Sequence, residues 1–143
     1  TVWLRAEQLD RATVAAMRDR LLPMLTGADP QGFRAPFAAL VLAEVARTDR
    51  IKAWMTAEDR DTLVTAAVAF LTGVQDYRAF SNTEGFRHGV AHGADFALQL
   101  VLNPAVAKPQ LDRLLAAIAT QVSPRQPVAY TAGEPDRLAR LRA

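Results

Sequence analysis

The sequence predicts an all-α fold, and three observations support that prediction. Apolar residues recur at spacings of three and four along most of the chain, which is the pattern of amphipathic helices. No stretch alternates apolar and polar residues over the length of a strand. Glycine, proline and small polar residues interrupt the helical pattern about every 25 residues. We therefore expect an irregular stack of α-α hairpins with about six to seven helices.

Three helices are expected in the first third of the chain. The first covers Val2–Leu9 and stops at Asp10, whose carboxylate can cap a second helix that runs to about Leu25. The segment "TGADPQG" ends that second helix. The third covers about Phe33–Arg47, with Pro36 in its first turn, where a missing N–H costs nothing.

The fourth helix begins with a capping signal. In "TAED", the Thr56 hydroxyl and the Asp59 carboxylate can each accept a hydrogen bond from a backbone N–H at the start of a helix. This helix is expected to continue to about Thr72.

Three further helices complete the prediction. The loop "VQDYRAFSN" leads to Thr83, which is expected to cap a fifth helix over residues 84–102. The sixth starts at Pro109 and ends near Val122, before the segment "SPRQP". The segment "GEPDRLARLR" starts a seventh helix near the end of the chain.

The spacing of the helices indicates a solenoid. Helix starts about 25 residues apart make one hairpin about every 50 residues, close to the 40–47 residues of HEAT and armadillo repeats. The hairpins share little sequence, so a compact helical bundle is the alternative. We expect residues 1–143 to form a single helical domain, because a chain of this length that is half hydrophobic can bury one core. Since Thr1 leads at once into a helical pattern, we expect this domain to be the C-terminal part of a longer protein.

The composition excludes several kinds of site. The 17 basic residues nearly balance the 15 acidic ones, so no nucleic-acid-binding surface is expected. The chain has no cysteine, which excludes disulfides, thiolate metal sites and cysteine nucleophiles. Its apolar runs are shorter than the roughly 20 residues of a membrane span. It has no phosphate-binding loop, dinucleotide fingerprint or serine nucleophile elbow.

Polar residues follow one edge of the expected fifth helix. A rotation of about 100° per residue brings five of them into one narrow sector, and they are Glu84, His88, His92, Asp95 and Gln99. His88 and His92 are the only histidines in the chain. Beside this edge runs a line of three glycines, at positions 85, 89 and 93, which indicates that a neighbouring backbone comes close.

Three interpretations of this polar edge are open. In the first, it faces solvent, as most polar helix faces do. In the second, it is a partly buried network in which a carboxylate fixes the tautomer of a histidine. In the third, His88, His92 and Asp95 converge on a zinc, iron or manganese ion, because two histidines four residues apart share a helical face. The leading expectation is that no cofactor binds.

The metal interpretation is incomplete in two respects. Metalloprotease helices carry a glutamate directly after the first histidine, and Gly89 occupies that position here. No third histidine is present, so a hydrolase would need a further carboxylate from Asp61, Asp76 or Glu84. In the segment "DYR", Asp76 and Arg78 can tie down their loop or line a pocket.

Four segments of the chain together resemble one protein family. They are "GFRAPFAALVLAEVARTDR", "DYRAF", "GFRHGVAHGAD" and "GEPDRLA", and they follow one another from about Phe33 to Ala139. In this order they are similar to the bacterial family catalogued as domain of unknown function 2785. The chain departs from the family pattern at Ala79, where the family tends to have glycine, and at Phe86, where it tends to have tryptophan. The pattern falls on Asp76, Arg78, Gly85, His88, His92, Asp95, Glu134, Arg137 and Leu138.

The resemblance implies a site but no activity, since the family has none assigned. It adds Glu134 and Arg137 to the candidate residues. It implies that residues of three consecutive elements meet on one surface, with Asp76 or Glu134 within hydrogen-bonding reach of the polar edge. Members of the family are longer at the N-terminus and some look exported. The compartment, cytoplasmic or exported, therefore stays open.

Two functions from different classes fit these residues. The leading expectation is a binding or scaffold domain that takes a protein, a peptide or a small ligand. Its site is expected to comprise Asp76, Arg78, Glu84, His88, His92, Asp95, Gln99, Glu134 and Arg137. The alternative is a metal-dependent hydrolase that uses His88, His92 and Asp95. A third view is that the residues of the polar edge only stabilise the fold.

Overall fold

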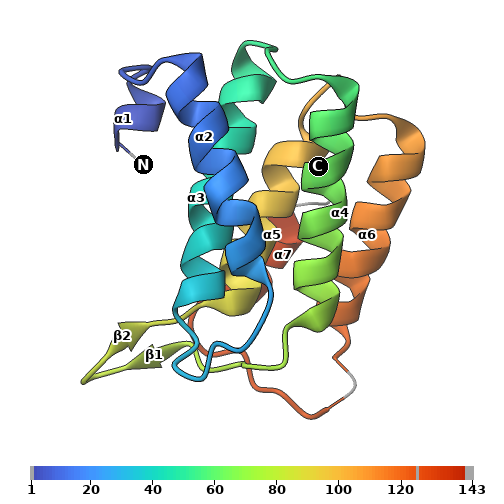
Figure 1. The fold of residues 1–143 in the computed structure, drawn as a ribbon. Coiled ribbons are helices and arrows are strands. Elements are labelled where there is room, and N and C mark those ends of the chain that lie inside the picture. Colours follow the sequence, from blue (N-terminus) through green and yellow to red (C-terminus); the bar gives the residue numbers. More distant parts are fainter. Residues whose placement is uncertain (1, 125, 141–143) are drawn as a thin grey trace.

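The long helices of the molecule lie side by side along one common direction (Figure 1). The computed structural model describes residues 2–124 and 126–140. The all-α prediction is confirmed, with one short hairpin added. The elements are α1 (Val2–Arg5), α2 (Arg11–Leu21), the 3-10 helix η1 (Leu22–Leu25), α3 (Arg34–Ile51), α4 (Ala57–Gly73), β1 (Phe80–Ser81), β2 (Gly85–Phe86), α5 (Gly89–Val101), α6 (Lys108–Val122) and α7 (Glu134–Ala139).

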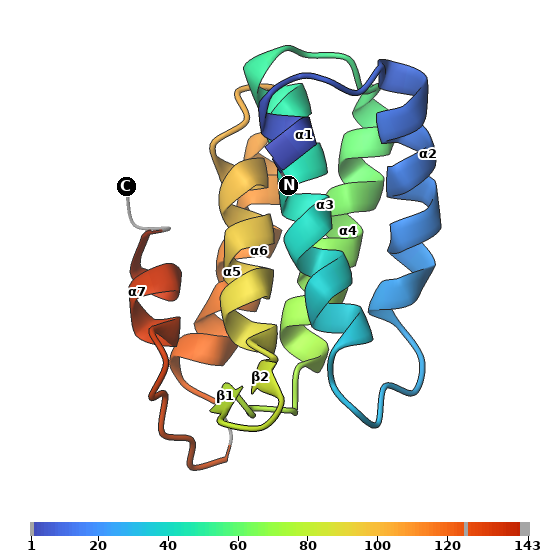
Figure 2. The same ribbon diagram turned by 90° about the vertical axis from the view of Figure 1, so that its left-hand side faces the viewer.

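The helices alternate between two layers (Figure 2). One layer contains α3, α5 and α7, and α5 lies between the other two. The other layer contains α2, α4 and α6, and α4 packs against α6. Apolar side chains of both layers form the core between them, as expected when helices bury one apolar face each. This is the arrangement of a helical stack, whereas its assignment to the HEAT or armadillo repeats stays a prediction.

Close packing of α5 against α4 explains one of the three glycines on the expected fifth helix. A Cβ atom added at Gly93 would lie 2.7 Å from Leu71 Cδ2 and 3.1 Å from Phe70 Cε1. Such distances are shorter than van der Waals contact, so a side chain at this position would displace α4 residues. A close neighbour is therefore present at Gly93, but it consists of α4 side chains and not of the backbone that the sequence predicted.

The expected fifth helix begins five residues later than predicted, because a hairpin precedes it. β1 and β2 pair antiparallel, and α5 begins at Gly89. Ser81 Oγ accepts hydrogen bonds from the backbone N–H groups of Thr83 and Glu84, which makes a tight turn. Gly85 follows with φ +79°, a conformation that favours glycine. The predictions that Thr83 caps a helix and that Glu84 lies on it are wrong.

The ends of four other helices differ from the prediction. α1 ends at Arg5, and α2 gives way to η1 because Pro23 has no N–H to continue the α-helical bonding. α3 extends beyond Arg47 to Ile51. α7 ends at Ala139, and residues 141–143 of the expected seventh helix lie outside the described residues. Of the helices described, none is long and apolar enough to cross a membrane.

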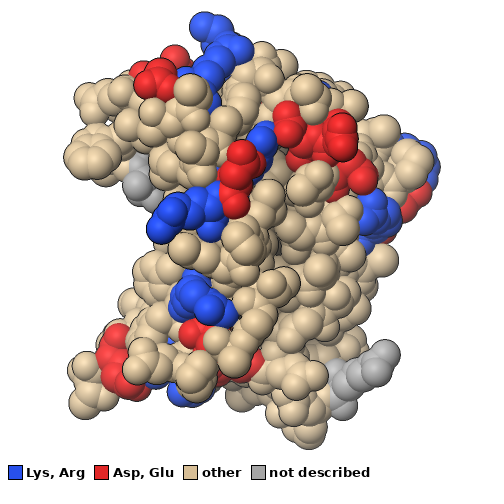
Figure 3. Space-filling view, in the orientation of Figure 1, with Lys and Arg blue, Asp and Glu red and all other residues tan. Residues whose placement is uncertain are grey.

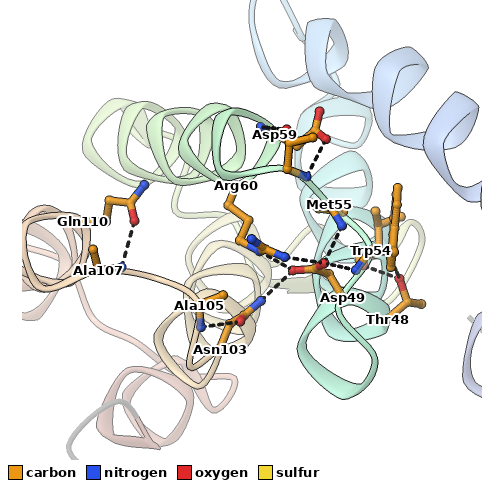
Figure 4. A network of polar contacts seen from close by, with 12 residues as sticks. Thr48, Asp49, Trp54, Met55, Asp59, Arg60, Asn103, Ala105, Ala107 and Gln110 are labelled. Atoms are coloured by element: carbon orange, nitrogen blue, oxygen red, sulfur yellow. Dashed lines mark hydrogen bonds and ion pairs between the residues drawn. The ribbon is translucent and has the colours of Figure 1, made fainter.

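A buried network around Asp49 holds the end of the molecule opposite the hairpin (Figure 4). Asp49 accepts hydrogen bonds from Arg60 Nε at 2.7 Å, Asn103 Nδ2 at 2.8 Å, and the backbone N–H groups of Trp54 and Met55. Burial alone would raise the pKa of Asp49, but these donors together lower it. The charged carboxylate thereby joins the end of α3, the start of α4 and the residues after α5.

Candidate functional site

The structure divides the predicted site residues into two clusters. The first, here called the α5 cluster, lies between α3 and α7 and contains His88, His92, Asp95, Glu134 and Arg137. The second, here called the loop cluster, joins the loops near the hairpin and contains Asp76, Arg78, Glu84 and Arg87. Gln99 belongs to neither, since it accepts a hydrogen bond from Arg50 Nε at 3.0 Å.

His88 connects the hairpin to α5 through an uncommon backbone conformation. Its φ of 55° and ψ of 39° are left-handed, and it precedes the first helical residue as the N-cap. Left-handed backbone is disfavoured for residues with a Cβ atom, by roughly 1–2 kcal/mol. The His88 side chain makes no capping hydrogen bond to the helix. Its ring lies near that of His92 instead, with the centroids 5.7 Å apart.

Exposed phenylalanine rings flank the two histidines. Phe37 of α3 lies 5.5 Å from the His92 ring, and Phe86 of β2 lies 4.4 Å from the His88 ring, both measured between centroids. Phe80 of β1 lies 4.7 Å from Phe86. The exposed fractions of Phe37, Phe80 and Phe86 are 44%, 55% and 49%. These five rings form a continuous surface, here called the aromatic row, from α3 to the hairpin.

The two imidazoles are neutral at pH 7. Burial lowers the pKa of His92 to about 4. His88, when it is protonated, and Arg137 act in the same direction. Burial also lowers the pKa of His88, although Glu134 opposes this effect. A neutral imidazole has one donor and one acceptor nitrogen. His88 Nε2 and His92 Nδ1 are buried, and neither forms a hydrogen bond within residues 2–124 and 126–140.

Arg137 of α7 contacts the Asp95 carboxylate on α5. Burial raises the pKa of Asp95, while Arg137 and Arg140 oppose the rise. Glu134 Oε2 accepts a hydrogen bond from the backbone N–H of Ala132, which fixes the start of α7. Across the described residues, neither Asp76 nor Glu134 is hydrogen-bonded to His88, His92 or Asp95. The contact from α7 to Asp95 comes from Arg137 instead.

A second ion pair near the α5 cluster was missed by the sequence analysis. Arg5 Nε of α1 donates to Glu44 Oε1 of α3 at 2.9 Å. The Glu44 side chain is only 7% exposed. Its negative charge helps to raise the pKa of Asp95, so the two carboxylates lie near each other. The sequence signal for this ion pair was Glu44 itself, an acidic residue at an inward-facing position of the expected third helix.

The loop cluster ties three loops together. Arg78 donates to Asp76 from Nε at 2.8 Å and from a terminal nitrogen at 2.6 Å, and these bonds lower the pKa of Asp76. Arg78 also donates to the Pro30 carbonyl. Arg87, which the sequence analysis missed, is buried and donates to the Gln31 carbonyl at 2.6 Å. These contacts hold the loop before α3 against the loop after α4.

Gly32 permits this tie. Its φ is +73°, and a Cβ atom there would lie 2.3 Å from Asp76 Oδ2 and 3.0 Å from a terminal nitrogen of Arg78. Both constraints require glycine. The structure thus supports the interpretation of "DYR" in which Asp76 and Arg78 tie down their loop. Asp76 also lines a cavity, which was the other interpretation.

The predicted metal ligands do not converge in this structure. Arg137 occupies one side of Asp95, and the two histidines lie against phenylalanine rings. In the part of the chain that the structure describes, no group of three or more histidine, aspartate or glutamate side chains is arranged to hold a metal ion. Metal binding by His88, His92 and Asp95 therefore stays a prediction.

Comparisons with known proteins support the resemblance. The sequence model of a family described as protein of unknown function (DUF2785) matches residues 23–142. No curated protein and no solved structure matches the chain. The matched range includes every residue of the α5 cluster and of the loop cluster. The chain therefore belongs to the DUF2785 family.

Proposed function

We propose that this domain binds an extended segment of a partner protein on the aromatic row and the adjoining α5 cluster. One observation carries the proposal: two neutral, partly buried imidazoles lie among phenylalanine rings that are about half exposed, and one nitrogen of each imidazole has no hydrogen-bond partner among the described residues. The surface thus offers both apolar contact and directional hydrogen bonds, which is the combination that peptide-binding surfaces use.

The phenylalanine rings supply the apolar contact. Large apolar side chains that gather on a surface mark interaction sites more often than scattered ones do. Aromatic side chains are also enriched in protein interfaces, since they bury a large area with few rotatable bonds. We therefore expect the partner segment to place an aromatic or large aliphatic side chain against Phe37 and Phe86.

The imidazoles supply the hydrogen bonds. A buried polar atom without a partner costs about 1–3 kcal/mol. His88 Nε2 and His92 Nδ1 are both buried, so the proposal requires the imidazole rings to turn outward, and a ligand that then bonds to these nitrogens recovers part of that cost. A peptide backbone offers an N–H donor and a carbonyl acceptor next to each side chain. Both nitrogens can then be satisfied whichever tautomer each histidine adopts.

The charges around the row favour an uncharged partner segment. Asp95 pairs with Arg137, and Glu44 pairs with Arg5, so these two carboxylates are compensated. The third carboxylate, Glu134, accepts a hydrogen bond from the backbone N–H of Ala132. A nucleic acid or a strongly acidic peptide would need unpaired basic groups. The proposed ligand is therefore a neutral stretch of polypeptide with at least one apolar anchor.

Titration with small blocked amino acids tests the proposal. N-acetylphenylalaninamide carries an aromatic ring and two amide groups, and N-acetylalaninamide carries the amides alone. We expect the first to shift the ring NMR signals of His88, His92 and Phe37, and the second to shift them far less. Phe86→Ala should weaken this binding by at least about fivefold, which corresponds to about 1 kcal/mol.

Leu115→Ala is the matched control, because Leu115 is a large apolar residue on α6 with a similar exposed fraction of 48%. It should leave the binding of N-acetylphenylalaninamide unchanged. Equal shifts with both amides, or equal losses in the Phe86 and Leu115 variants, would refute the proposal. His92→Phe keeps an aromatic ring without the nitrogens, and it should also weaken binding.

Metal-dependent hydrolysis by His88, His92 and Asp95 is the alternative proposal. The observation in its favour is that the two histidine rings are adjacent and their nitrogens are unpaired within the described residues. It requires Asp95 to leave Arg137. The test is the metal content of the purified protein. If it retains about one zinc, iron or manganese ion per chain and the His92→Ala variant does not, this alternative replaces the binding proposal.

A further inference from the structure

A second site, separate from the aromatic row, lies between η1 and α4. A cavity of about 610 Å³ opens there, and none of its lining residues belongs to the aromatic row or the α5 cluster. Its walls are mainly apolar and include Leu22, Leu25, Phe70 and Val74. We propose that this cavity, here called the η1–α4 cavity, binds an uncharged small molecule with a mainly hydrocarbon surface.

The size of the cavity suits a small molecule. Ligand pockets in proteins measure about 300–1,000 Å³ and are lined mostly by apolar side chains. Small residues keep the space open, since Ala66, Ala69 and Gly73 of α4 line it. A Cβ atom added at Gly73 would have no neighbour within 4 Å. Gly73 is exposed, so the space beside it is open at the mouth of the cavity.

The loop cluster builds one end of the cavity. Asp76 lines the cavity, and its bonds to Arg78 join it to the loop that carries Gly32, another lining residue. The Pro30 carbonyl accepts from Arg78 and holds the same loop. Because these contacts fix the wall before any ligand arrives, little ordering is needed on binding.

The charges of the lining exclude a charged ligand. Asp29 and Asp76 are the charged lining residues, and both carboxylates are already bonded, Asp29 to the backbone N–H of Ala35 and Asp76 to Arg78. An anion would meet two carboxylates. A cation would have to pair with a carboxylate that already accepts hydrogen bonds, Asp76 from Arg78 or Asp29 from the backbone N–H of Ala35. Burial of a charge without a free partner is costly. On this face, the C-terminal half of α4 is also largely uncharged (Figure 3).

Three probes of equal chain length test the inference: octanol, octylamine and octanoate. Methyl NMR signals of Leu22, Leu25 and Val74 report directly on the cavity walls. We expect octanol to shift these signals saturably, and octylamine and octanoate to bind at least about fivefold more weakly, because each would bring an unpaired charge into the cavity.

A cavity-filling variant identifies the site. Gly73→Leu adds a large side chain at a lining residue whose Cβ position is free of neighbours, and it should weaken octanol binding by at least about tenfold. Thr72→Leu is the matched control, because Thr72 is the adjacent exposed residue of α4 and does not line the cavity. It should leave octanol binding within about twofold of the unmodified protein.

Three results would overturn the inference. The first is no shift of the cavity methyl signals up to the solubility limit of octanol. The second is octanoate or octylamine binding as tightly as octanol. The third is that Gly73→Leu leaves the affinity for octanol unchanged, or that octanol shifts the NMR signals of Phe37 and Phe86 and not those of the cavity residues. Gly73 and Thr72 do not belong to the aromatic row. These results therefore do not test the peptide-binding proposal, which has its own experiment.

Discussion

Replacement of His92 by glutamine should weaken the pH dependence of stability. Glutamine can still form hydrogen bonds but does not titrate. In the folded protein the His92 ring faces Phe37, His88 and Arg137, and burial is the main reason that its pKa falls from 6.5 to about 4. In the unfolded chain the pKa returns to about 6.5. The unfolded chain therefore binds a proton first as the pH falls.

The sign and size of the effect follow from this difference. Stability from the neutral ring is fully present above the unfolded pKa of about 6.5, and it is lost as the pH falls toward about 4. A pKa lowered from 6.5 to about 4 corresponds to about 3 kcal/mol, at about 1.4 kcal/mol for each tenfold change in proton affinity. Because His92 is partly exposed, solvent screening reduces the expected loss to about 1–2 kcal/mol.

Urea unfolding followed by far-ultraviolet circular dichroism measures this loss. Between about pH 7.5 and pH 4.5, the free energy of unfolding should fall by about 1–2 kcal/mol more in the unmodified protein than in His92→Gln. Carboxylates such as Asp95 titrate in both proteins, so the comparison isolates His92. Parallel curves for the two proteins would refute the conclusion that His92 is buried in its neutral form.

Three further predictions concern packing and hydrogen bonding. Asp49→Asn should lower the free energy of unfolding by about 3–5 kcal/mol, because it leaves the nearly buried Arg60 without its anion; a loss below about 1 kcal/mol in urea unfolding would contradict this. Gly93→Ala should be less stable than Gly73→Ala by about 1–2 kcal/mol, since only the first adds a Cβ atom within 2.7 Å of another side chain; equal stabilities would contradict the close packing of α5 on α4. Tyr130→Phe should cost about 1 kcal/mol, because the Tyr130 hydroxyl donates to a backbone carbonyl at the end of α6 at 2.6 Å. Burial raises the pKa of Tyr130 to about 12, so in an ultraviolet titration the variant should lose the phenol that ionises near pH 12.

The helices were predictable because their signals are local. The capping box of Thr56 and Asp59 is present at the start of α4, and Asp10 caps α2 by accepting from the Thr13 N–H at 2.8 Å. Each of these signals depends on residues within one turn of the chain. The resemblance to the DUF2785 family was also correct, since it depended on several ordered segments and not on one motif.

The start of α5 was not predictable from the helical pattern. A helical wheel assumes one continuous helix, and Glu84 and His88 have spacings that fit it. The turn at Ser81 and the left-handed backbone of His88 interrupt that helix. Positive φ at a histidine is stabilised by the surrounding contacts, and no local sequence signal specifies it.

The composition of the site was predictable only in part. The adjacency of His88 and His92 was expected from their spacing of four residues, and the structure brings the rings to 5.7 Å although His88 precedes the helix. Tertiary packing decides which residues contact α5. The sequence therefore predicted Asp95 and Arg137 only as two residues of a larger site, and it did not predict that they pair with each other. Asp76 and Arg78 were expected in the same set, but their bonds to each other and to the Pro30 carbonyl place them in the separate loop cluster.

The measurement that most directly tests the peptide-binding proposal is the nuclear Overhauser effect between N-acetylphenylalaninamide and the protein. The account predicts cross-peaks from the phenyl ring of the probe to the rings of Phe37, His92 and Phe86, which together cover α3, α5 and the hairpin. Cross-peaks confined to Leu22, Leu25 and Val74 in the η1–α4 cavity would contradict the account, as would a probe at saturating concentration with no cross-peaks to the aromatic row.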